Sequence, residues 1–367
     1  MRTVAIITCY KYPDYGRAVN LRAGLLANPD IQTIVIKNRY KSIFRYPEVL
    51  LKVITARVRH RPDMYLLTFR GYEMLPAVSL LALGKPVILD ELINPLEVVS
   101  EHRQLYKGKL TNRLMSLWQL FGSLYNLLLR HCRAVIADTA AHADYSSKMT
   151  GMPRNRYQVI PVGANESIFK SPSRPVAQSP SPVGFTVLYY GSMVPLHGLS
   201  YVLEAAEKLE DQPHINFLLI GGSKNASIQI EESIKNGARI THKDWVEPKY
   251  LPKTINQAGL CLGGPFGDTI QSQLVITGKT FEFLASAAPA LIGETKETAT
   301  SKQFKDKVNC LMVPQGNAAA IAEAIVWAST HPNELSKIGL AGSQLYKQSF
   351  SQSIIAQKLA KMIDELS

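Results

Sequence analysis

The feature of this sequence that most constrains its fold is a regular alternation of short apolar runs with longer amphipathic segments, which stops once and then starts again. In the first half, runs rich in β-branched residues predict strands at 3–8, 31–36, 64–69, 86–89, 134–137 and 157–162. Helical spacing between them predicts helices near 18–26, 48–58, 73–83, 112–129 and 140–149. Such alternation is typical of a parallel sheet that helices cover on both faces.

The alternation is interrupted at residues 170–182, which hold four prolines and four serines in thirteen residues and too few apolar groups to pack. It then resumes with predicted strands at 185–190, 215–220, 239–241, 260–262, 290–292 and 310–313. The predicted helices of this half are 199–209, 227–235, 250–258, 278–287, 318–328, 333–346 and 353–366. The interruption therefore reads as a linker between two similar halves.

A chain of 367 residues is long enough for two domains. We predict an α/β protein with two doubly wound, Rossmann-like domains that face a central cleft. The boundaries that we expect are 1–170 for the first domain, 171–183 for the linker, 184–349 for the second domain, and 350–367 for a C-terminal helix that packs back toward the first. Open α/β sheets bind ligands at the carboxyl ends of their strands.

Several classes of protein are disfavoured by composition. No uncharged apolar run reaches the roughly 18 residues of a membrane span, and the start of the chain reads as a buried strand and not as a signal peptide. The four cysteines stand far apart without metal-binding spacing, which favours buried thiols in the cytoplasm. His131, Asp138, His142 and Asp144 surround one predicted strand-helix junction, and we assign them no chemistry. We expect no metal and no cofactor.

The net charge of +12 lies entirely in the first half: residues 1–170 hold 24 Lys/Arg and 12 Asp/Glu, whereas 171–367 hold 17 of each. Eight basic residues fall between 37 and 61, where Val49, Leu50, Val53, Ile54 and Val58 recur at helical spacing. A second apolar stretch with basic flanks runs from 114 to 128. Basic amphipathic helices are typical of proteins that lie on an anionic membrane surface, although a helix packed on the sheet with a solvated basic rim is the alternative. No nucleic-acid motif supports a nucleic-acid partner.

Five segments of the second half carry a resemblance to a known family. They are 159–163 with Phe169; 188–198, which reads Leu-Tyr-Tyr-Gly-Ser-Met-Val-Pro-Leu-His-Gly; 217–222; Asp244-Trp-Val-Glu247; and 265–268 leading to 278–285 and Pro289. Their order and spacing resemble family 4 glycosyltransferases, which belong to the GT-B superfamily with glycogen phosphorylase. The resemblance implies the GT-B fold and a nucleotide-sugar donor bound by the second domain.

The turn from Gly191 to Gly198 is the first part of the donor site that the resemblance implies. A helix that begins near Gly198 directs unpaired N–H groups at a diphosphate, and His197 would assist if protonated. The alternative is that both glycines only make a turn and a cap. Relatives carry Arg and Lys in this turn, where this chain has Ser192 and His197, so two permanent charges are lost.

The second part is the helix after the loop 263–277. The resemblance implies that Glu282 accepts hydrogen bonds from the ribose hydroxyls and that Lys279 balances diphosphate charge; an exposed ion pair within the helix is the alternative. Eight residues before Glu282, many relatives have a glutamate and this chain has Leu274. Backbone groups of the loop at Gly267 and Thr269, with the Asp268 side chain, are the candidate replacements. Val246 completes the predicted donor contacts.

In the first half, Asp90 and Glu91 follow a predicted strand and are our candidates for a catalytic side chain, against a structural role in a helix start or ion pair. Gly16 and Arg17 lie in the turn after the first strand, where they would meet the acceptor or an anionic group. A plain strand-helix turn would look the same.

The function that these residues predict is retaining transfer of a sugar from a nucleotide-sugar to an acceptor, such as a cell-envelope glycan or a lipid-linked saccharide. In a front-face displacement the leaving diphosphate takes the acceptor proton, so positioning and charge stabilisation matter more than a dedicated base. Two alternatives are open: a degenerate GT-B module that only binds nucleotide-sugars, and a nucleotide-sugar epimerase. We expect a cytoplasmic protein. The alternative is a peripheral protein bound to the inner face of the membrane.

Overall fold

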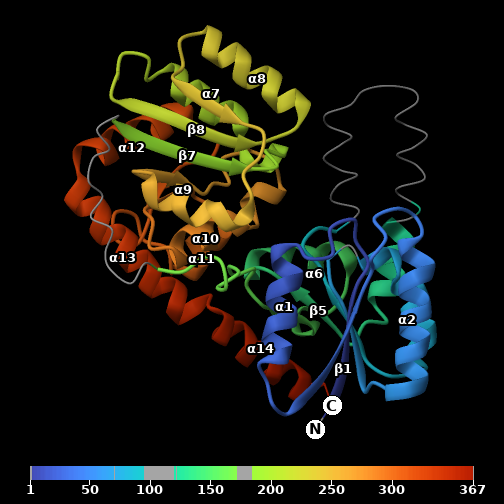
Figure 1. Ribbon diagram of the computed structural model, residues 1–367. Coiled ribbons are helices and arrows are strands. Elements are labelled where there is room, and N and C mark those ends of the chain that lie inside the picture. The colour runs from blue at the N-terminus through green and yellow to red at the C-terminus, as the bar shows by residue number, and fades with distance from the viewer. Residues whose placement is uncertain (1, 70, 95–119, 121, 172–183, 367) are drawn as a thin grey trace. The chain divides into compact units, whose positions relative to one another are not determined.

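The protein is described by a computed structural model of residues 2–69, 71–94, 120, 122–171 and 184–366 (Figure 1). The chain divides into two compact units. Unit 1 comprises Met1–Val162 together with Gln352–Ser367, and unit 2 comprises Gly163–Ser351. The predicted linker lies, apart from Ser171, outside the described residues, as do residues 114–119 and 121 of the second apolar stretch.

Unit 1 is built on a six-stranded parallel sheet with strand order β2-β1-β3-β4-β5-β6. Its strands are β1 (Arg2–Thr8), β2 (Ile31–Lys37), β3 (Met64–Leu67), β4 (Val87–Asp90), β5 (Ala134–Ala137) and β6 (Tyr157–Val159). The middle strands β3, β4 and β5 are buried along their whole length, as expected of parallel strands that are covered on both faces.

The helices of unit 1 are α1 (Gly16–Leu26), α2 (Arg45–His60), α3 (Leu75–Ala82), α6 (Ala140–Thr150) and α14 (Gln352–Glu365). Residues 122–129 form a further helical segment. One core cluster joins α1 and α14 to one face of the sheet, and another joins α2, α3, the segment 122–129 and α6 to the other. Because α14 closes the first of these clusters with Ile355 and Leu359, the end of the chain is part of unit 1 (Figure 1).

Unit 2 contains a second six-stranded parallel sheet, with strand order β12-β11-β10-β7-β8-β9. The strands are β7 (Phe185–Gly191), β8 (Ile215–Gly221), β9 (Ile240–Lys243), β10 (Leu260–Leu262), β11 (Ala290–Gly293) and β12 (Leu311–Val313). The neighbouring strands β7 and β8 are in register from Phe185 opposite Ile215 to Gly191 opposite Gly221. The strand order changes direction between β7 and β10, which is where doubly wound sheets bind ligands.

The helices of unit 2 are α7 (Leu199–Glu207), α8 (Lys224–Lys235), α9 (Leu251–Gln257), α10 (Gly278–Ala285), α11 (Lys296–Ser301), α12 (Ala318–Thr330) and α13 (Pro332–Ser349). Short 3-10 turns include η3 (Pro195–His197) before α7 and η4 (Pro248–Tyr250) before α9. The main core lies where α7, α8, α12 and α13 cover the sheet.

The predicted fold class is confirmed: both halves are parallel sheets between helices. The short helix α11 is absent from the sequence prediction, because five of its six residues are polar and its start depends on a capping box between Thr295 and Thr298. The two units also differ from the predicted domains at residues 163–170 and 350–351, which lie with unit 2. There the Tyr346 hydroxyl of α13 contacts the backbone N–H of Ala164 and the Glu166 carboxylate.

All four cysteines are free and buried. Among the described residues, no helix combines the length and apolar character that a membrane crossing requires.

Candidate functional site

The residues predicted to hold a donor gather at the carboxyl edge of the sheet in unit 2. Strand β7 ends at Gly191, the turn η3 follows, and Gly198 stands as the N-cap of α7 with φ of 68°. A non-glycine residue is disfavoured at this φ. The first N–H groups of α7 are therefore presented next to the end of β7, as a helix N-terminus that binds anions requires.

Gly198 and Gly267 allow two backbone segments to touch. A Cβ on Gly198 would lie 2.5 Å from the backbone N of Gly267, and a Cβ on Gly267 would lie 2.5 Å from the carbonyl oxygen of Pro195. The N–H of Gly267 donates to the carbonyl of Leu196 at 3.1 Å. The turn before α7 and the loop after β10 thus form one packed unit that depends on glycine at both positions.

Lys279 lies in the first turn of α10 and is only 6% exposed. Its Nζ has no hydrogen-bond partner among the described residues and lies 3.9 Å from the centroid of the Tyr189 ring. Burial lowers the pKa of Lys279 from 10.5 to about 7, while the Glu282 carboxylate raises it in part. A buried amine without an acceptor is costly, and none of the described residues supplies a hydrogen-bond acceptor to Lys279.

His197 lies close to Lys279 at the carboxyl edge of the sheet in unit 2. Its ring Nδ1 is buried and has no hydrogen-bond partner among the described residues. Burial, with a further contribution from the nearby Lys279, holds the pKa of His197 well below its usual value. The imidazole is therefore neutral at pH 7, and the expected assistance from a protonated His197 is not what this environment favours. A neutral ring still offers a hydrogen-bond donor.

Glu282 is held by Tyr190. The Tyr190 hydroxyl donates to Oε2 of Glu282, and the Tyr190 ring packs edge-on against Phe283 with centroids 5.3 Å apart. Burial raises the pKa of Glu282 to about 7, and the hydrogen bond from Tyr190 and the charge of Lys279 oppose this shift. One carboxylate oxygen is thus fixed, and Oε1 takes no hydrogen bond from the described residues.

The other non-glycine residues predicted to contact the donor are more exposed than Lys279. Asp268 is exposed and accepts a hydrogen bond from the Tyr201 hydroxyl of α7 at 3.1 Å. Thr269 caps the turn after it, since its Oγ1 accepts from the backbone N–H of Ser272. Ser192 is exposed in the turn after β7, and Val246 lies half-buried between β9 and η4.

In unit 1, the predicted roles of Asp90 and Arg17 are not what the structure favours, because the two side chains bind each other. Oδ1 of Asp90 accepts from Nε and Nη2 of Arg17 at 3.0 and 2.8 Å, and Oδ2 accepts from the backbone N–H of Phe69. Arg17 also donates to the carbonyls of Ile160 and Pro161. Both side chains are almost fully buried. The pair ties α1 to β4 and to the chain after β6, and leaves neither group free for a substrate.

Glu91 is similarly committed. Its carboxylate accepts hydrogen bonds from the hydroxyls of Tyr125 and Ser146, and Nε2 of His142 lies 4.0 Å from Oε1. His142 in turn contacts Asp138 through Nδ1 at 2.7 Å. This buried polar network gives Asp138 and His142 structural roles, whereas His131 and Asp144 are exposed and contact the Leu127 carbonyl and Arg154. In the described part of the chain, no group of three His, Cys, Asp or Glu side chains could hold a metal ion.

Gly16 begins α1 and is exposed, and a Cβ there would meet no atom within 4 Å. Its backbone therefore needs no glycine for packing. Sequence reasoning missed the tyrosines of the site in unit 2, Tyr189, Tyr190 and Tyr201. The signal was available: a tyrosine at the carboxyl end of a buried strand must find a partner for its hydroxyl, and two stand directly before Gly191.

One known family model matches a part of this chain. Residues 184–331 match the family model described as Glycosyl transferases group 1. This segment runs from the start of β7 to the residue after α12 and includes the glycine turn, Lys279 and Glu282. The matched segment lies wholly within unit 2. Comparison with curated protein sequences finds no match.

Solved structures resemble the chain over its whole length. Alr3699/HepE of Anabaena, solved in complex with UDP and glucose, is 13% identical with a TM-score of 0.68, and the match covers 100% of both chains. Sucrose-phosphate synthase from Thermosynechococcus elongatus is 14% identical with a TM-score of 0.71 over 100% of this chain and 99% of that one. A glycosyltransferase from Rickettsia africae is 15% identical with a TM-score of 0.64, covering 100% and 98%. These likenesses establish the GT-B fold.

Proposed function

We propose that this chain, with a glycosyltransferase group 1 domain in its second unit, is a retaining glycosyltransferase that moves a hexose from a nucleotide-sugar to an acceptor. The acceptor class that we favour is a cell-envelope glycan or a lipid-linked saccharide. One observation carries the proposal: the buried Nζ of Lys279 has no hydrogen-bond acceptor among the described residues and stands on the same helix as the half-buried carboxylate of Glu282. A nucleoside diphosphate has the phosphate and ribose groups that would satisfy both.

The diphosphate would lie between Lys279 and the N-terminus of α7. A phosphate oxygen would give the Lys279 ammonium its missing acceptor, and the first N–H groups after Gly198 would donate to the same group. The neutral imidazole of His197 adds a hydrogen-bond donor but no charge. Lys279 then replaces, from α10, part of the positive charge that relatives place in the turn before α7.

The ribose would be bound by Glu282. Tyr190 fixes Oε2, so Oε1 is positioned for a ribose hydroxyl. A hydroxyl donates well to a carboxylate, and ligand binding would favour the ionised form of Glu282 over the neutral form. Val246 and the loop at Gly267 and Thr269 are the predicted backbone contacts for the rest of the donor.

The transfer itself needs no dedicated base in this proposal. The bond between the anomeric carbon and the diphosphate oxygen breaks, the acceptor oxygen bonds to the anomeric carbon on the same face, and the acceptor proton passes to the departing diphosphate. Lys279 and the α7 N-terminus stabilise the charge on that leaving group, which is why we propose a metal-independent reaction. Asp90 and Glu91 are already engaged in buried contacts.

UDP-glucose is the first donor to test, because the structurally similar Alr3699/HepE was solved in complex with UDP-glucose. A second candidate function is binding without turnover. It is favoured by Leu274, which is 3% exposed at the position where relatives carry a glutamate, so this residue offers no polar contact to the sugar.

The two candidates are separated by nucleotide release. Purified protein is incubated with UDP-, GDP- and dTDP-glucose, with and without a membrane and glycan extract, and free nucleotide is measured. Release that requires the extract supports transfer, and saturable binding with no release supports the binding module. Sugar conversion without an acceptor would contradict both. Lys279→Met should remove the signal, while Lys224→Met, an exposed lysine of α8 in the same unit, should leave it unchanged.

A further inference from the structure

Three helical segments cover one face of the unit 1 sheet as a single layer. Arg57 of α2 donates to the carbonyl of Ala82 at the end of α3. The ring of Tyr72, just before α3, packs edge-on against Tyr125 of the segment 122–129 with centroids 5.9 Å apart. All three contribute to the same core cluster. Their order across the sheet is therefore α2, α3 and 122–129.

This layer exposes apolar side chains on its outer side. On α2, Val49 and Val53 are fully buried against the sheet and Leu50 packs against the same core, so three of the five residues predicted for a membrane face lie inward instead. The outer residues of the layer are large and aliphatic: Leu51 (64% exposed), Ile54 (38%) and Val58 (72%) on α2, Leu80 (74%) and Leu83 (70%) on and after α3, and Leu124 (49%) and Leu127 (54%) on the segment 122–129. We call this set the outer leucine face.

Basic residues stand at the C-terminal ends of the three segments, and we call them the basic rim. Arg59, His60 and Arg61 stand at the end of α2, Lys85 follows α3, and Arg130, His131 and Arg133 follow the segment 122–129. Acids near this end include Asp63, which is paired with Lys85 at 3.6 Å, and Asp364 and Glu365, which directly precede Leu366 and are paired with Arg2 and Lys361. Cations at helix C-termini also complement the helix dipole, but that role does not call for exposed leucines beside them.

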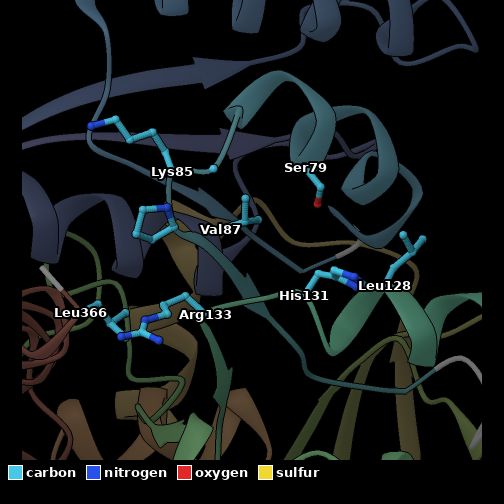
Figure 2. A pocket seen from close by; sticks show the side chains of 9 residues that line it. Ser79, Lys85, Val87, Leu128, His131, Arg133 and Leu366 are labelled. Atoms are coloured by element: carbon cyan, nitrogen blue, oxygen red, sulfur yellow. The ribbon is translucent and has the colours of Figure 1, made fainter.

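A cavity of about 690 Å³ opens among these basic residues. It is lined by Ser79, Lys85, Val87, His131 and Arg133, with Leu128 and Leu366 at its sides. Figure 2 shows Ser79, His131 and Leu128 on one side of the cavity and Arg133 beside Leu366 on the other. Two permanent cations and a hydroxyl are a suitable lining for a phosphate group.

We propose that the outer leucine face and its basic rim dock unit 1 on an anionic lipid bilayer, with a headgroup phosphate in the cavity. Aliphatic side chains beside Arg and Lys are the composition of interfacial helices. Protein interfaces are instead enriched in aromatic residues and depleted in Lys, and the outer leucine face contains no aromatic residue. This surface would bring a lipid-linked acceptor to the enzyme, although the docking itself does not depend on the proposed transfer activity.

The test is flotation of the full chain with neutral phosphatidylcholine vesicles and with vesicles containing equal parts of phosphatidylglycerol. We expect strong binding to the anionic vesicles and weak binding to the neutral ones. Each basic residue near the surface contributes about a fivefold factor, so Arg59→Glu with Arg133→Glu should weaken partitioning by at least roughly thirtyfold. Leu80→Gln with Leu83→Asn should weaken it on the same vesicles while retaining the preference for anionic lipid.

The controls change the same residue types elsewhere. Leu26→Ser alters an exposed leucine of α1 on the opposite face of the sheet, and Lys224→Glu reverses a charge in unit 2; both should bind vesicles like the wild type. Equal effects of the controls, or no binding to either vesicle, would overturn the proposal. So would a dimer in sedimentation that Leu80→Gln with Leu83→Asn converts to monomer, because the face would then bind a second copy. Nucleotide-sugar binding, measured without vesicles, tests the proposed function separately.

Discussion

The hydroxyl of Tyr190 donates a hydrogen bond to Oε2 of Glu282, and this contact joins the end of β7 to the middle of α10. The same strand supplies Tyr189, whose ring lies against Nζ of Lys279 and whose hydroxyl donates to the carbonyl of His197. Two adjacent tyrosines thus position the carboxylate and the amine of the donor site. Because the two hydroxyls have different partners, replacing one tyrosine at a time tests the Glu282 contact and the His197 contact separately.

Tyr190→Phe should weaken nucleotide-sugar binding by about tenfold, because a hydrogen bond to a charged group contributes about 1.5 to 3 kcal/mol. The Tyr190 hydroxyl also lowers the pKa of Glu282. Its loss should therefore raise the pH at which affinity begins to fall on acidification, which we call the acid limb of binding. Calorimetric titration of the donor between pH 5.5 and 8 measures both effects. Tyr189→Phe is the matched control, since it removes a hydroxyl that does not contact Glu282. An acid limb that moves equally in both variants would rule out the positioning role.

Lys279→Met should stabilise the protein near neutral pH in the absence of ligand. The pKa of Lys279 is lowered to about 7 in the fold, so between pH 7 and its unfolded value the unfolded chain holds a proton that the native chain lacks. Stability from this group therefore rises with pH across that window, by up to about 1.4 kcal/mol per pH unit. Urea unfolding at pH 7, 8 and 9 should show the rise in the wild type and its loss in Lys279→Met. An identical pH slope in both proteins contradicts the buried, unpaired amine.

Gly198→Ala should destabilise the protein and impair donor binding together. The position has φ of 68° and its Cβ would meet the backbone of Gly267, so strain of about 1 to 3 kcal/mol is expected. Gly16→Ala is the matched control, because a Cβ there meets nothing and alanine favours helix by about 0.5 to 1 kcal/mol. Thermal unfolding compares the two. Equal and small shifts would mean that the glycine turn does not need its close approach.

Asp90→Asn should cost about 3 to 5 kcal/mol of unfolding free energy, because it leaves Arg17 buried and unpaired. Arg17→Met should cost a similar amount, and the double variant should cost clearly less than the sum of the two. Denaturant unfolding of all four proteins completes the cycle. A stable Asp90→Asn protein that binds donor but has lost turnover would instead restore the catalytic role that the sequence suggested.

The sequence predicted most of the architecture because the hydrophobic periodicity and the positions of glycine and proline indicate the same strands and helices. Buried parallel strands such as β5 read as unbroken apolar runs, and glycine or proline marks several of their ends. The short helix α11 escaped prediction because its formation depends on two threonine side chains and not on a hydrophobic pattern.

The site was predictable only in part. Spacing within one helix placed Lys279 and Glu282 near each other, and the resemblance supplied roles for them. Burial was not readable, because it depends on how β7 packs against α10. Asp90 and Arg17 show the opposite case: each is a plausible functional residue in the sequence, and only the fold reveals that 73 positions of separation close into one ion pair.

The most direct test of the central claim is calorimetric titration of UDP-glucose into the wild type, Lys279→Met and Lys224→Met at pH 7. The account predicts saturable binding to the wild type and Lys224→Met, and at least tenfold weaker binding to Lys279→Met. Two results would contradict the claim that Lys279 binds a diphosphate. One is that UDP-, GDP- and dTDP-glucose all fail to bind at millimolar concentration, and the other is that UDP-glucose binds all three proteins with equal affinity.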